Sequence, residues 1–252
     1  MTVSIDLNAD LGEGCGNDRE LLSLVTSASI ACGFHAGDPD AMLANIAAAK
    51  EAGVAVGAHP SLADREHFGR RELQVTADEV FALVAYQVGA FAALARAAGI
   101  VPQHVKPHGA LYNMAARDPN LADAVMRAIV STDSSLVVFA PAGSELAKAA
   151  SKHGLCVARE FFADRNYLPD GTLVPRSQPD AVLHDPAIAV ARVLRVLREG
   201  VVHATDVTDL LMPVDTICLH GDTPEAISFA LNLRTTLLAA GVRLSSIRRL
   251  VE

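Results

Sequence analysis

The sequence lacks the short motifs that identify several large classes of enzyme. It contains no GxxxxGKS or GxxxxGKT, so it has no P-loop of its own to cradle a phosphate, and no GxSxG, which argues against a covalent serine mechanism. The glycine-rich segment 12–16, GEGCG, lacks the GxGxxG spacing of a dinucleotide-binding turn. HExxH is also absent, which leaves open only a metal site built from separate segments.

Basic charge and paired cysteines are scarce as well. The chain of 252 residues has 21 Lys and Arg against 29 Asp and Glu, a formal net charge of −8. It therefore has no electrostatic footprint for nucleic acid. The four cysteines form no CxxC pair, which favours reduced thiols over a disulfide framework or a structural zinc site; they are Cys15, Cys32, Cys156 and Cys218.

Apolar runs of membrane-spanning length are missing too. Asp6 and Asp10 interrupt the N-terminal region, where a signal peptide would need an apolar run. The most apolar segment, VFALVAYQVGAFAALA at 80–95, contains Gln87 and Gly89 and is shorter than the roughly 20 residues that a bilayer requires. We therefore expect a helix buried between a sheet and its neighbours, no membrane contact, and a cytoplasmic protein.

What the chain does contain is a regular alternation of short apolar segments and alanine-rich helical segments. Strands are predicted at Ser4–Ala9, Ala28–Cys32, Val54–Ala58, His104–Lys106, Leu136–Ala140, Cys156–Arg159 and Thr216–Leu219. Helices are predicted at Pro39–Ala52, Ala77–Ala98, Leu121–Val130, Ser144–His153, Pro186–Arg198 and Pro224–Ala240. Repeated strand–helix units predict a mostly parallel sheet covered by helices.

The chain is expected to form one domain, because no linker divides it. Hydrophobic residues make up 51% of it, enough for a substantial core. The segment 164–183 breaks the rhythm, since it has three prolines and a PDG turn signal. We predict a loop or small hairpin there, inserted across one end of a domain that spans residues 1–252.

The first predicted strand has two unlike faces. Its apolar and polar residues alternate, which places Asp6, Asn8 and Asp10 together on one side. Such a polar face could be the solvent-exposed side of an edge strand, or it could line an active-site cavity.

Polar and basic residues follow most of the predicted strands. The carboxyl ends of parallel strands gather at one edge, where such folds bind their ligands. A lone histidine there more often serves a structural hydrogen bond, but the repetition predicts a shared site. The candidates are Asp10, Glu13, His35, Asp38, His59, Arg70, Arg71, Lys106, His108, Tyr112, Asn113, Glu160, Asp164, Arg165, His220 and Asp222. Asp10, His35 and His59 are the natural trio for a divalent metal.

Seven long segments that hold these residues resemble the LamB/YcsF family. They are DLNADLGEG, IACGFHAGDP, GVAVGAHPS, FGRR, HVKPHGALYN, EFFADRNY and TICLHGD, and they lie in the expected order between Asp6 and Asp222. Cys15 stands where an aromatic residue is expected, and SLADREH at 61–67 departs from the usual loop. These departures concern the shape of loops, because the polar residues of the segments are retained.

The resemblance implies an irregular seven-stranded (β/α) barrel, similar to glycoside hydrolases and polysaccharide deacetylases. It also implies the role of the A subunit of an ATP-dependent 5-oxoprolinase, which hydrolyses the lactam of 5-oxo-L-proline to L-glutamate. ATP is then a co-substrate handled with two partners, the B and C subunits. Whether the chain also forms a homo-oligomer is left open.

Roles in this hydrolysis follow as a hypothesis. Asp10 is the general base, and Asp6 and Asn8 orient it from the same strand face. Lys106 stabilises negative charge on the activated oxygen, and His108 exchanges protons with the ring nitrogen. The residues expected to bind substrate or phosphate, or to complete the pocket wall, are Asn8, Arg70, Arg71, Glu160, Arg165, His220 and Asp222.

Two other functions fit the same residues. One is a stand-alone metal-dependent amide hydrolase or deacetylase that uses Asp10, His35 and His59 on a divalent ion. The other is a non-catalytic subunit that only binds and delivers the substrate.

Overall fold

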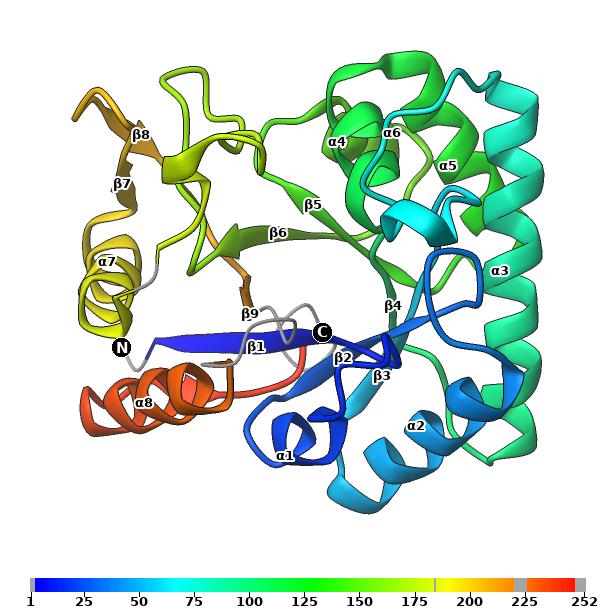
Figure 1. Cartoon of the computed structure of the whole chain (residues 1–252), viewed down its shortest axis with the longest axis horizontal. Helices are drawn as coiled ribbons and strands as arrows, with labels where there is room; N and C mark the ends of the chain where they lie inside the picture. The colour runs from blue at the N-terminus through cyan, green and yellow to red at the C-terminus, as the bar shows by residue number, and fades with distance from the viewer. Residues whose placement is uncertain (1–2, 184, 220–225, 248–252) are drawn as a thin grey trace.

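Seven parallel strands close into a barrel at the centre of the molecule (Figure 1). The computed structural model describes residues 3–183, 185–219 and 226–247. The order around the barrel follows the chain, and the last strand pairs with the first. The seven strands are β1 (Ser4–Leu11), β2 (Ser27–Ala31), β3 (Ala55–His59), β4 (His104–Val105), β5 (Val137–Pro141), β6 (Val157–Phe162) and β9 (Thr216–Leu219). The seven-stranded barrel implied by the resemblance is confirmed.

Helices surround the barrel (Figure 1). They are α1 (Asp18–Leu22), α2 (Pro39–Ala52), α3 (Ala77–Ala97), α4 (Gly109–Arg117), α5 (Pro119–Thr132), α6 (Glu145–Lys152), α7 (Pro186–Glu199) and α8 (Ala226–Ala239). Shorter elements are the 3-10 helices η1 (Arg65–His67) and η2 (Pro179–Ala181), the hairpin of β7 (Val201–His203) and β8 (Asp209–Leu211), and β10 (Arg243–Leu244), which pairs with β1. Every predicted strand and helix overlaps an observed one, whereas α1, α4, β10 and the β7–β8 hairpin were not predicted.

Local sequence signals explain where the long helices begin. The Asp38 side chain accepts a hydrogen bond from Ala41 N at 2.8 Å, and Pro39 occupies the first turn of α2. Thr76 and Glu79 form a reciprocal capping box at the start of α3. These caps satisfy backbone N–H groups that have no partner within the helix.

The two faces of β1 lie in different surroundings. Ile5 and Leu7 are buried in the hydrophobic core. Asn8, on the other face, donates to Glu160 on β6 at 3.1 Å and to Thr216 on β9 at 2.7 Å. The polar face of β1 is therefore the inside of the barrel.

Helix α3 is covered on one side only. Of the helices in the described ranges, it alone is long and apolar enough to cross a membrane by length and composition. It packs against α5, and Val84 and Phe91 are buried. On its other side Tyr86 is 66% exposed. The expected burial of this helix therefore holds for one face, because the outer face has no further layer above it.

The segment 164–183 forms an irregular antiparallel loop. Isolated bridges join Arg165 to Val182 and Tyr167 to Leu173, and η2 follows near its end. The stretch 173–177 of this loop lines the cavity at the barrel mouth. The loop therefore forms one wall of the site that the strand ends create.

Gly57 on β3 leaves room for a buried imidazole. A Cβ at this position would overlap the ring and the carbonyl oxygen of His104 on the next strand. That ring stacks on Phe139 with the centroids 4.2 Å apart and lies 3.1 Å from Ser29 Oγ through its Nε2. We expect Gly57→Ala to lower the free energy of unfolding by about 1–3 kcal/mol, because backbone must move to relieve the overlap.

Urea denaturation followed by circular dichroism measures this change. The matched control is Gly89→Ala on α3, where the added carbon would meet nothing within 4 Å apart from its chain neighbours and the backbone of its own helix. That variant should be neutral or gain about 0.5–1 kcal/mol from helix propensity. Equal stabilities for the two variants would contradict the packing assigned to Gly57.

Candidate functional site

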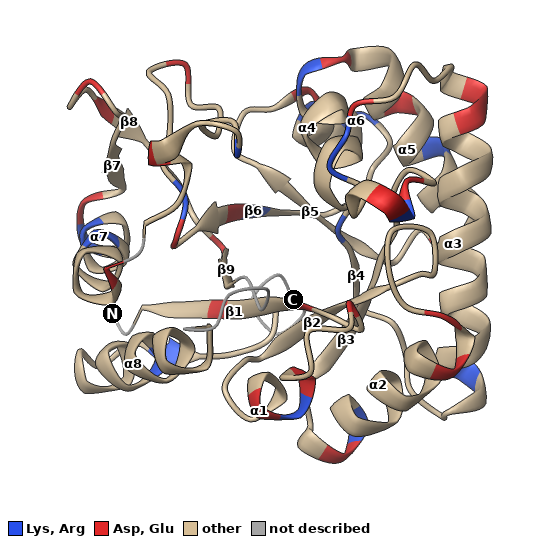
Figure 2. Ribbon diagram, in the orientation of Figure 1, with Lys and Arg blue, Asp and Glu red and all other residues tan. Residues whose placement is uncertain are grey.

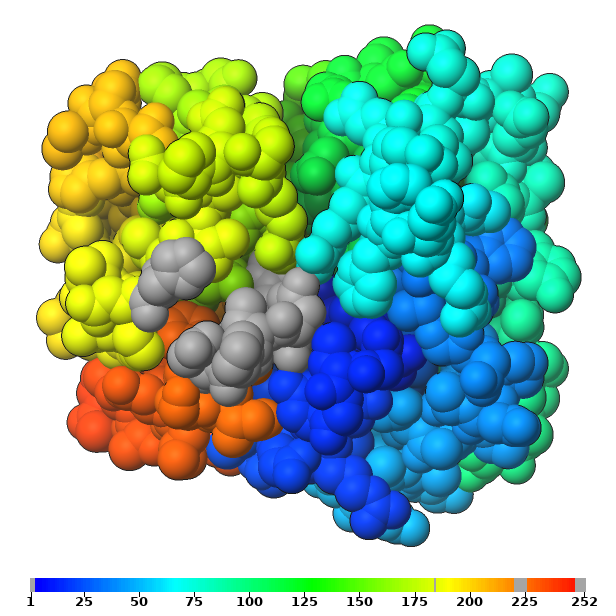
Figure 3. All heavy atoms as spheres, in the orientation of Figure 1, coloured from blue at the N-terminus to red at the C-terminus, as the bar shows by residue number. Residues whose placement is uncertain are grey.

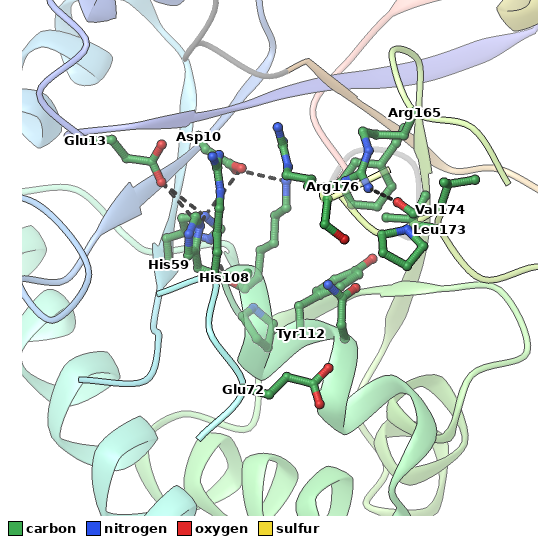
Figure 4. A pocket seen from close by; sticks show the side chains of 18 residues that line it. Asp10, Glu13, His59, Glu72, His108, Tyr112, Arg165, Leu173, Val174 and Arg176 are labelled. Atoms are coloured by element: carbon green, nitrogen blue, oxygen red, sulfur yellow. Dashed lines mark hydrogen bonds and ion pairs between the residues drawn. The ribbon is translucent and has the colours of Figure 1, made fainter. Parts of the chain in front are cut away.

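A pocket of about 300 Å³ opens at the carboxyl ends of the strands (Figure 4). It is lined by Asp10, Glu13, His59, Arg70, Glu72, Lys106, Pro107, His108, Gly109, Tyr112, Asn113, Phe162, Arg165, Leu173, Val174, Pro175, Arg176 and Ser177. The surface is hollowed between the yellow-green segment that includes the 164–183 loop and the green and cyan segments opposite (Figure 3). Residues far apart in the chain therefore meet in one cavity.

The Lys106 ammonium stands at the floor of this pocket, surrounded by acceptors. Its Nζ lies 2.9 Å from Asp10 Oδ1, 2.9 Å from Glu160 Oε1 and 3.2 Å from Asn8 Oδ1. Cys218 Sγ is 3.0 Å away. Acidic positions on β1 and β6 face the basic position beside β4 across the barrel (Figure 2). The Lys106 side chain is only 2% exposed.

These acceptors keep Lys106 charged. Burial by itself lowers the pKa of a lysine, but the neighbouring Asp10, Cys218 and Glu160 outweigh it and hold the pKa of Lys106 well above its usual value. The side chain is therefore an ammonium ion throughout the neutral range, with a carboxylate on either side.

A second cluster, which we call the imidazole cluster, consists of Glu13, His35, His59 and His108. Glu13 Oε1 lies 3.0 Å from His35 Nε2, 3.3 Å from His108 Nδ1 and 3.7 Å from His59 Nε2. The four potential ligand atoms all lie within 4.8 Å of one another. The rings of His35 and His108 stack in parallel with their centroids 3.9 Å apart. These four residues come from three successive strand ends and the first loop.

Backbone carbonyls fix the orientation of two of these rings. His59 Nδ1 lies 2.6 Å from the Lys106 carbonyl oxygen, and His108 Nε2 lies 2.9 Å from that of Phe68. Carbonyl oxygens only accept hydrogen bonds, so each of these nitrogens is the one that carries a hydrogen. The other nitrogens, His59 Nε2 and His108 Nδ1, consequently face each other at 2.9 Å.

The three imidazoles differ in charge. Burial lowers the pKa of His35 to about 2 and that of His108 well below its usual value, with neighbouring histidines adding to both shifts. Burial would also lower the pKa of His59, but the carboxylates of Asp10 and Glu13 raise it above its usual value. His59 is therefore the ring that takes a proton most readily.

The potential ligand atoms that lie together include those of His35 and His59 of the predicted trio but not those of Asp10. Asp10 Oδ2 is 3.4 Å from His59 Nε2, and its other oxygen accepts from Lys106. Glu13 and His108 instead complete the group of potential ligands. Glu13 was recognised as a strand-end acid but received no role in the hypothesis.

Asp6 and Asn8 do not line the pocket, and neither forms a hydrogen bond with Asp10. Three hydroxyl groups donate to the Asp6 carboxylate, namely Thr26 at 2.6 Å, Ser27 at 2.7 Å and Thr216 at 2.5 Å. Asn8 contacts Lys106 through Oδ1. The two residues therefore hold neighbouring strands together and help to bind Lys106. No hydrogen bond supports the prediction that they orient Asp10 directly.

Three arginines line the pocket, and one of them adjoins the imidazole cluster through Phe68, whose ring packs against His35 and His108. The three are Arg70, Arg165 and Arg176, and the Arg70 guanidinium lies over the Phe68 ring at 4.8 Å. Arg165 is buried and donates to the carbonyl oxygens of Ala181 at 3.0 Å and Val174 at 2.6 Å. Burial and the nearby Arg176 lower the pKa of Arg165 to about 10, still well above neutrality.

Other predicted site residues lie elsewhere. Arg71 is half-exposed, donates to Asp64 Oδ1 at 3.0 Å and does not line the pocket. His220 and Asp222 lie outside the described residues. Arg176 lines the pocket but was not among the predicted site residues. It lies between Pro175 and Pro179 in the segment 164–183, which interrupts the alternation of strands and helices.

A second cavity of about 750 Å³ adjoins the first and shares Tyr112, Asn113 and Phe162 with it. Glu160 lines only this second cavity, while its Oε1 reaches Lys106. Burial raises the pKa of the Tyr112 hydroxyl well above its usual value, and Glu160 raises it further. Tyr112 is therefore a neutral group on the wall between the two cavities.

Known proteins resemble the chain over nearly its full length. The model of the LamB/YcsF family matches residues 5–252. A protein from Methylococcus capsulatus, named as the A subunit of 5-oxoprolinase, is 53% identical over 252 residues, which cover 98% of this chain and 97% of that protein. The crystal structure of a lactam utilization protein from Thermus thermophilus is 44% identical, has a TM-score of 0.90, and covers 96% of this chain and 99% of that one.

More distant structures share the fold. A deacetylase, T48, solved with its substrate, gives a TM-score of 0.53 at 16% identity over 99% of this chain and 90% of that one. The peptidoglycan deacetylase PdaC from Bacillus subtilis gives 0.52 at 14% identity with the same coverage. The expected similarity to the deacetylase barrel is confirmed, and at these identities the likeness concerns the fold alone.

Asp6 provides a test of the barrel interior. Burial raises the pKa of Asp6 to about 6, against the opposing effect of its three hydroxyl donors, so ionising it inside the barrel is unfavourable. As the pH rises from about 4 to about 6, the wild type should lose stability relative to Asp6→Asn by roughly 1–3 kcal/mol. Denaturant unfolding of both proteins at several pH values measures the difference. If the difference in the free energy of unfolding between the two proteins stays constant over this range, the pKa of Asp6 is the same in the folded and the unfolded state, which contradicts the prediction.

Proposed function

Because the chain belongs to the LamB/YcsF family, we propose that it acts as the A subunit of an ATP-dependent 5-oxoprolinase. The complex would hydrolyse the lactam of 5-oxo-L-proline to L-glutamate while ATP is hydrolysed. The names of the two close relatives, one for a 5-oxoprolinase component and one for a lactam utilization protein, support this proposal. The B and C subunits would be the partners, in the cytoplasm.

The chemistry divides naturally between the subunits. A five-membered lactam resists attack by water because its amide resonance must be lost. Transfer of a phosphoryl group from ATP to the carbonyl oxygen would make the carbon electrophilic and provide a leaving group. Since this chain has no P-loop, we assign the phosphoryl transfer to the partners. The steps left to this chain are the addition of water, the stabilisation of the resulting anion, and the opening of the ring to an acyl phosphate. A second water would then release the phosphate and give L-glutamate.

The observation that carries the proposal is the Lys106 ammonium held between Asp10 and Glu160 in the pocket. A fixed cation in a site of low dielectric stabilises negative charge as it develops on a reacting oxygen. Asp10 adjoins this cation at the pocket wall. We therefore propose that Asp10 removes the proton from water and that Lys106 stabilises the oxyanion or the phosphate.

The departing ring nitrogen needs a proton. His108 was the predicted donor, but its Nε2 faces the Phe68 carbonyl and its Nδ1 faces His59. Its lowered pKa also leaves it neutral at pH 7. We propose that Asp10 returns the proton it took from water to this nitrogen, so that one carboxylate serves both steps.

The arginine side of the pocket suits the substrate's carboxylate. Arg70, Arg165 and Arg176 all line it, the last two from the 164–183 loop. A guanidinium binds a carboxylate or a phosphate through parallel hydrogen bonds. With the carboxylate at this side, the lactam ring would lie toward Lys106 and Asp10. This orientation places the reacting carbonyl next to the cation.

The reaction assay uses the purified chain with its partner subunits, ATP and 5-oxoproline, and measures the release of glutamate. We expect Asp10→Asn and Lys106→Met to lower kcat by about 100-fold or more, since each removes a group that acts in the transition state. Lys148→Met, at an exposed lysine that pairs with Glu145, is the matched control and should keep the normal rate.

Lys106→Met leaves two buried carboxylates without their cation, so its folding is checked by thermal denaturation, and Asp10→Asn serves as the isosteric second variant. Near-normal rates in both folded variants would refute these roles and favour a protein that only binds and delivers the substrate. Glutamate release without ATP and partners would instead favour the stand-alone amide hydrolase.

Neighbouring arginines allow a test of the binding side. Arg70 lines the pocket, whereas Arg71 pairs with Asp64 outside it. We expect Arg70→Met to raise KM for 5-oxoproline by about tenfold, the equivalent of about 1.4 kcal/mol of lost binding. Arg71→Met should change KM less than about twofold, because the Arg71 guanidinium is held by Asp64 and does not line the pocket. Steady-state kinetics in the same assay measure both values, and the reverse order would place the carboxylate elsewhere.

A further inference from the structure

We propose that Glu13, His35, His59 and His108 bind one divalent transition-metal ion at the edge of the pocket. The lactam hydrolysis outlined above uses none of these four side chains as acid, base or anion-binding group. The site is thus an addition to the proposed function and does not depend on it.

The distances within the imidazole cluster match those around a single ion. With metal–ligand bonds of about 2.0–2.1 Å, neighbouring ligand atoms lie about 3.3 Å apart in a tetrahedron and about 2.9 Å apart in an octahedron. Four of the pairs measured here are 2.9, 3.0, 3.3 and 3.7 Å. The spacing of these pairs therefore fits coordination of one ion, and rotation of one of the stacked rings, His35 or His108, would bring both lone pairs onto it.

The hydrogen bonds around the cluster call for a positive charge at its centre. The outer nitrogens of His59 and His108 donate to backbone carbonyls, so their inner nitrogens present lone pairs to each other at 2.9 Å. Two lone pairs at that distance repel unless a proton or a metal ion lies between them. Histidines that ligate metals are held in this same way, with the second ring nitrogen donating to a carbonyl.

A third imidazole reaches the same carboxylate oxygen. His35 Nε2 lies 3.0 Å from the same Glu13 oxygen that faces the other two rings. A single proton can join two of these groups, whereas a metal ion can bind all four.

The donor set indicates the class of metal. Three imidazoles and one carboxylate suit Zn²⁺ and its first-row neighbours, such as Co²⁺, whereas Mg²⁺ and Ca²⁺ favour oxygen ligands. Glu13, His59 and His108 line the pocket while His35 does not. An ion held here would therefore be approached from the pocket, on the side where Asp10 lies.

Metal binding is tested on the full-length chain without any assay of activity. The protein is treated with a chelator, dialysed and titrated with ZnCl₂ by isothermal calorimetry, and its cobalt complex is examined by absorption spectroscopy. We expect one Zn²⁺ per chain, visible d–d bands with CoCl₂, and a rise in Tm on adding either metal.

Two variants and a control separate the cluster from other histidines. Glu13→Gln and His35→Gln should each weaken Zn²⁺ binding at least tenfold and alter the cobalt spectrum. His153→Gln, at a histidine that pairs with Asp123 on the outer surface of the helical layer, should bind Zn²⁺ as the wild type does. No stoichiometric binding by the folded wild type, or equal binding by all four proteins, would overturn the proposal and leave a proton shared by His59 and His108.

Discussion

The interaction on which the site depends is the ion pairing of Lys106 inside the barrel. A lone ammonium in this position would lose its hydration at a penalty of several kcal/mol, so it requires carboxylates close by. Asp10 comes from β1 and Glu160 from β6, and each lies 2.9 Å from Lys106 Nζ. Removing either partner from such a group typically destabilises a protein by about 3–5 kcal/mol. The lysine therefore constrains which side chains β1, β6 and β9 can present to the interior.

The same constraint links the fold to the chemistry. Parallel strands bring their carboxyl ends to the same end of the barrel. The charged side chains of the site gather at this end, where the pocket opens. The imidazole cluster adjoins Lys106 through His59, whose Nδ1 lies 2.6 Å from the Lys106 carbonyl oxygen. Arg165 and Arg176 come from the 164–183 loop, and Arg70 follows β3 beside the imidazole cluster. The floor of the pocket thus carries carboxylates around the Lys106 ammonium, and its wall carries arginines. This distribution of charge suits an anionic substrate with a reacting carbonyl.

The sequence predicted the barrel well because its signals are local. Strict alternation in β1 sorted Asp6, Asn8 and Asp10 onto the inner face, and helix caps such as Asp38 fixed the element ends. The short helix α4 was missed because it begins directly after β4 at Gly109, within a segment interpreted as a strand end. Strand-end position also led to Lys106 and His59.

Contacts between strands could not be predicted in the same way. Glu13 and Asp10 are both acids near the end of β1, and only the curvature of the loop decides which one reaches the three histidines. Arg70 and Arg71 are adjacent in the chain, yet only Arg70 lines the pocket, because Arg71 pairs with Asp64. Arg176 depends on the path of an irregular loop that no periodicity describes.

The protonation state of Lys106 tests this account most directly. The chain has four lysines, Lys50, Lys106, Lys148 and Lys152, so the side-chain nitrogen of Lys106 can be assigned in ¹⁵N-lysine-labelled protein by comparison with Lys106→Met. If Asp10 and Glu160 hold the ammonium as described, its NMR titration will show a pKa above the ordinary value of about 10.4. A pKa below that ordinary value would contradict the central claim, and a pKa below about 7 would mean that the amine is neutral at neutral pH.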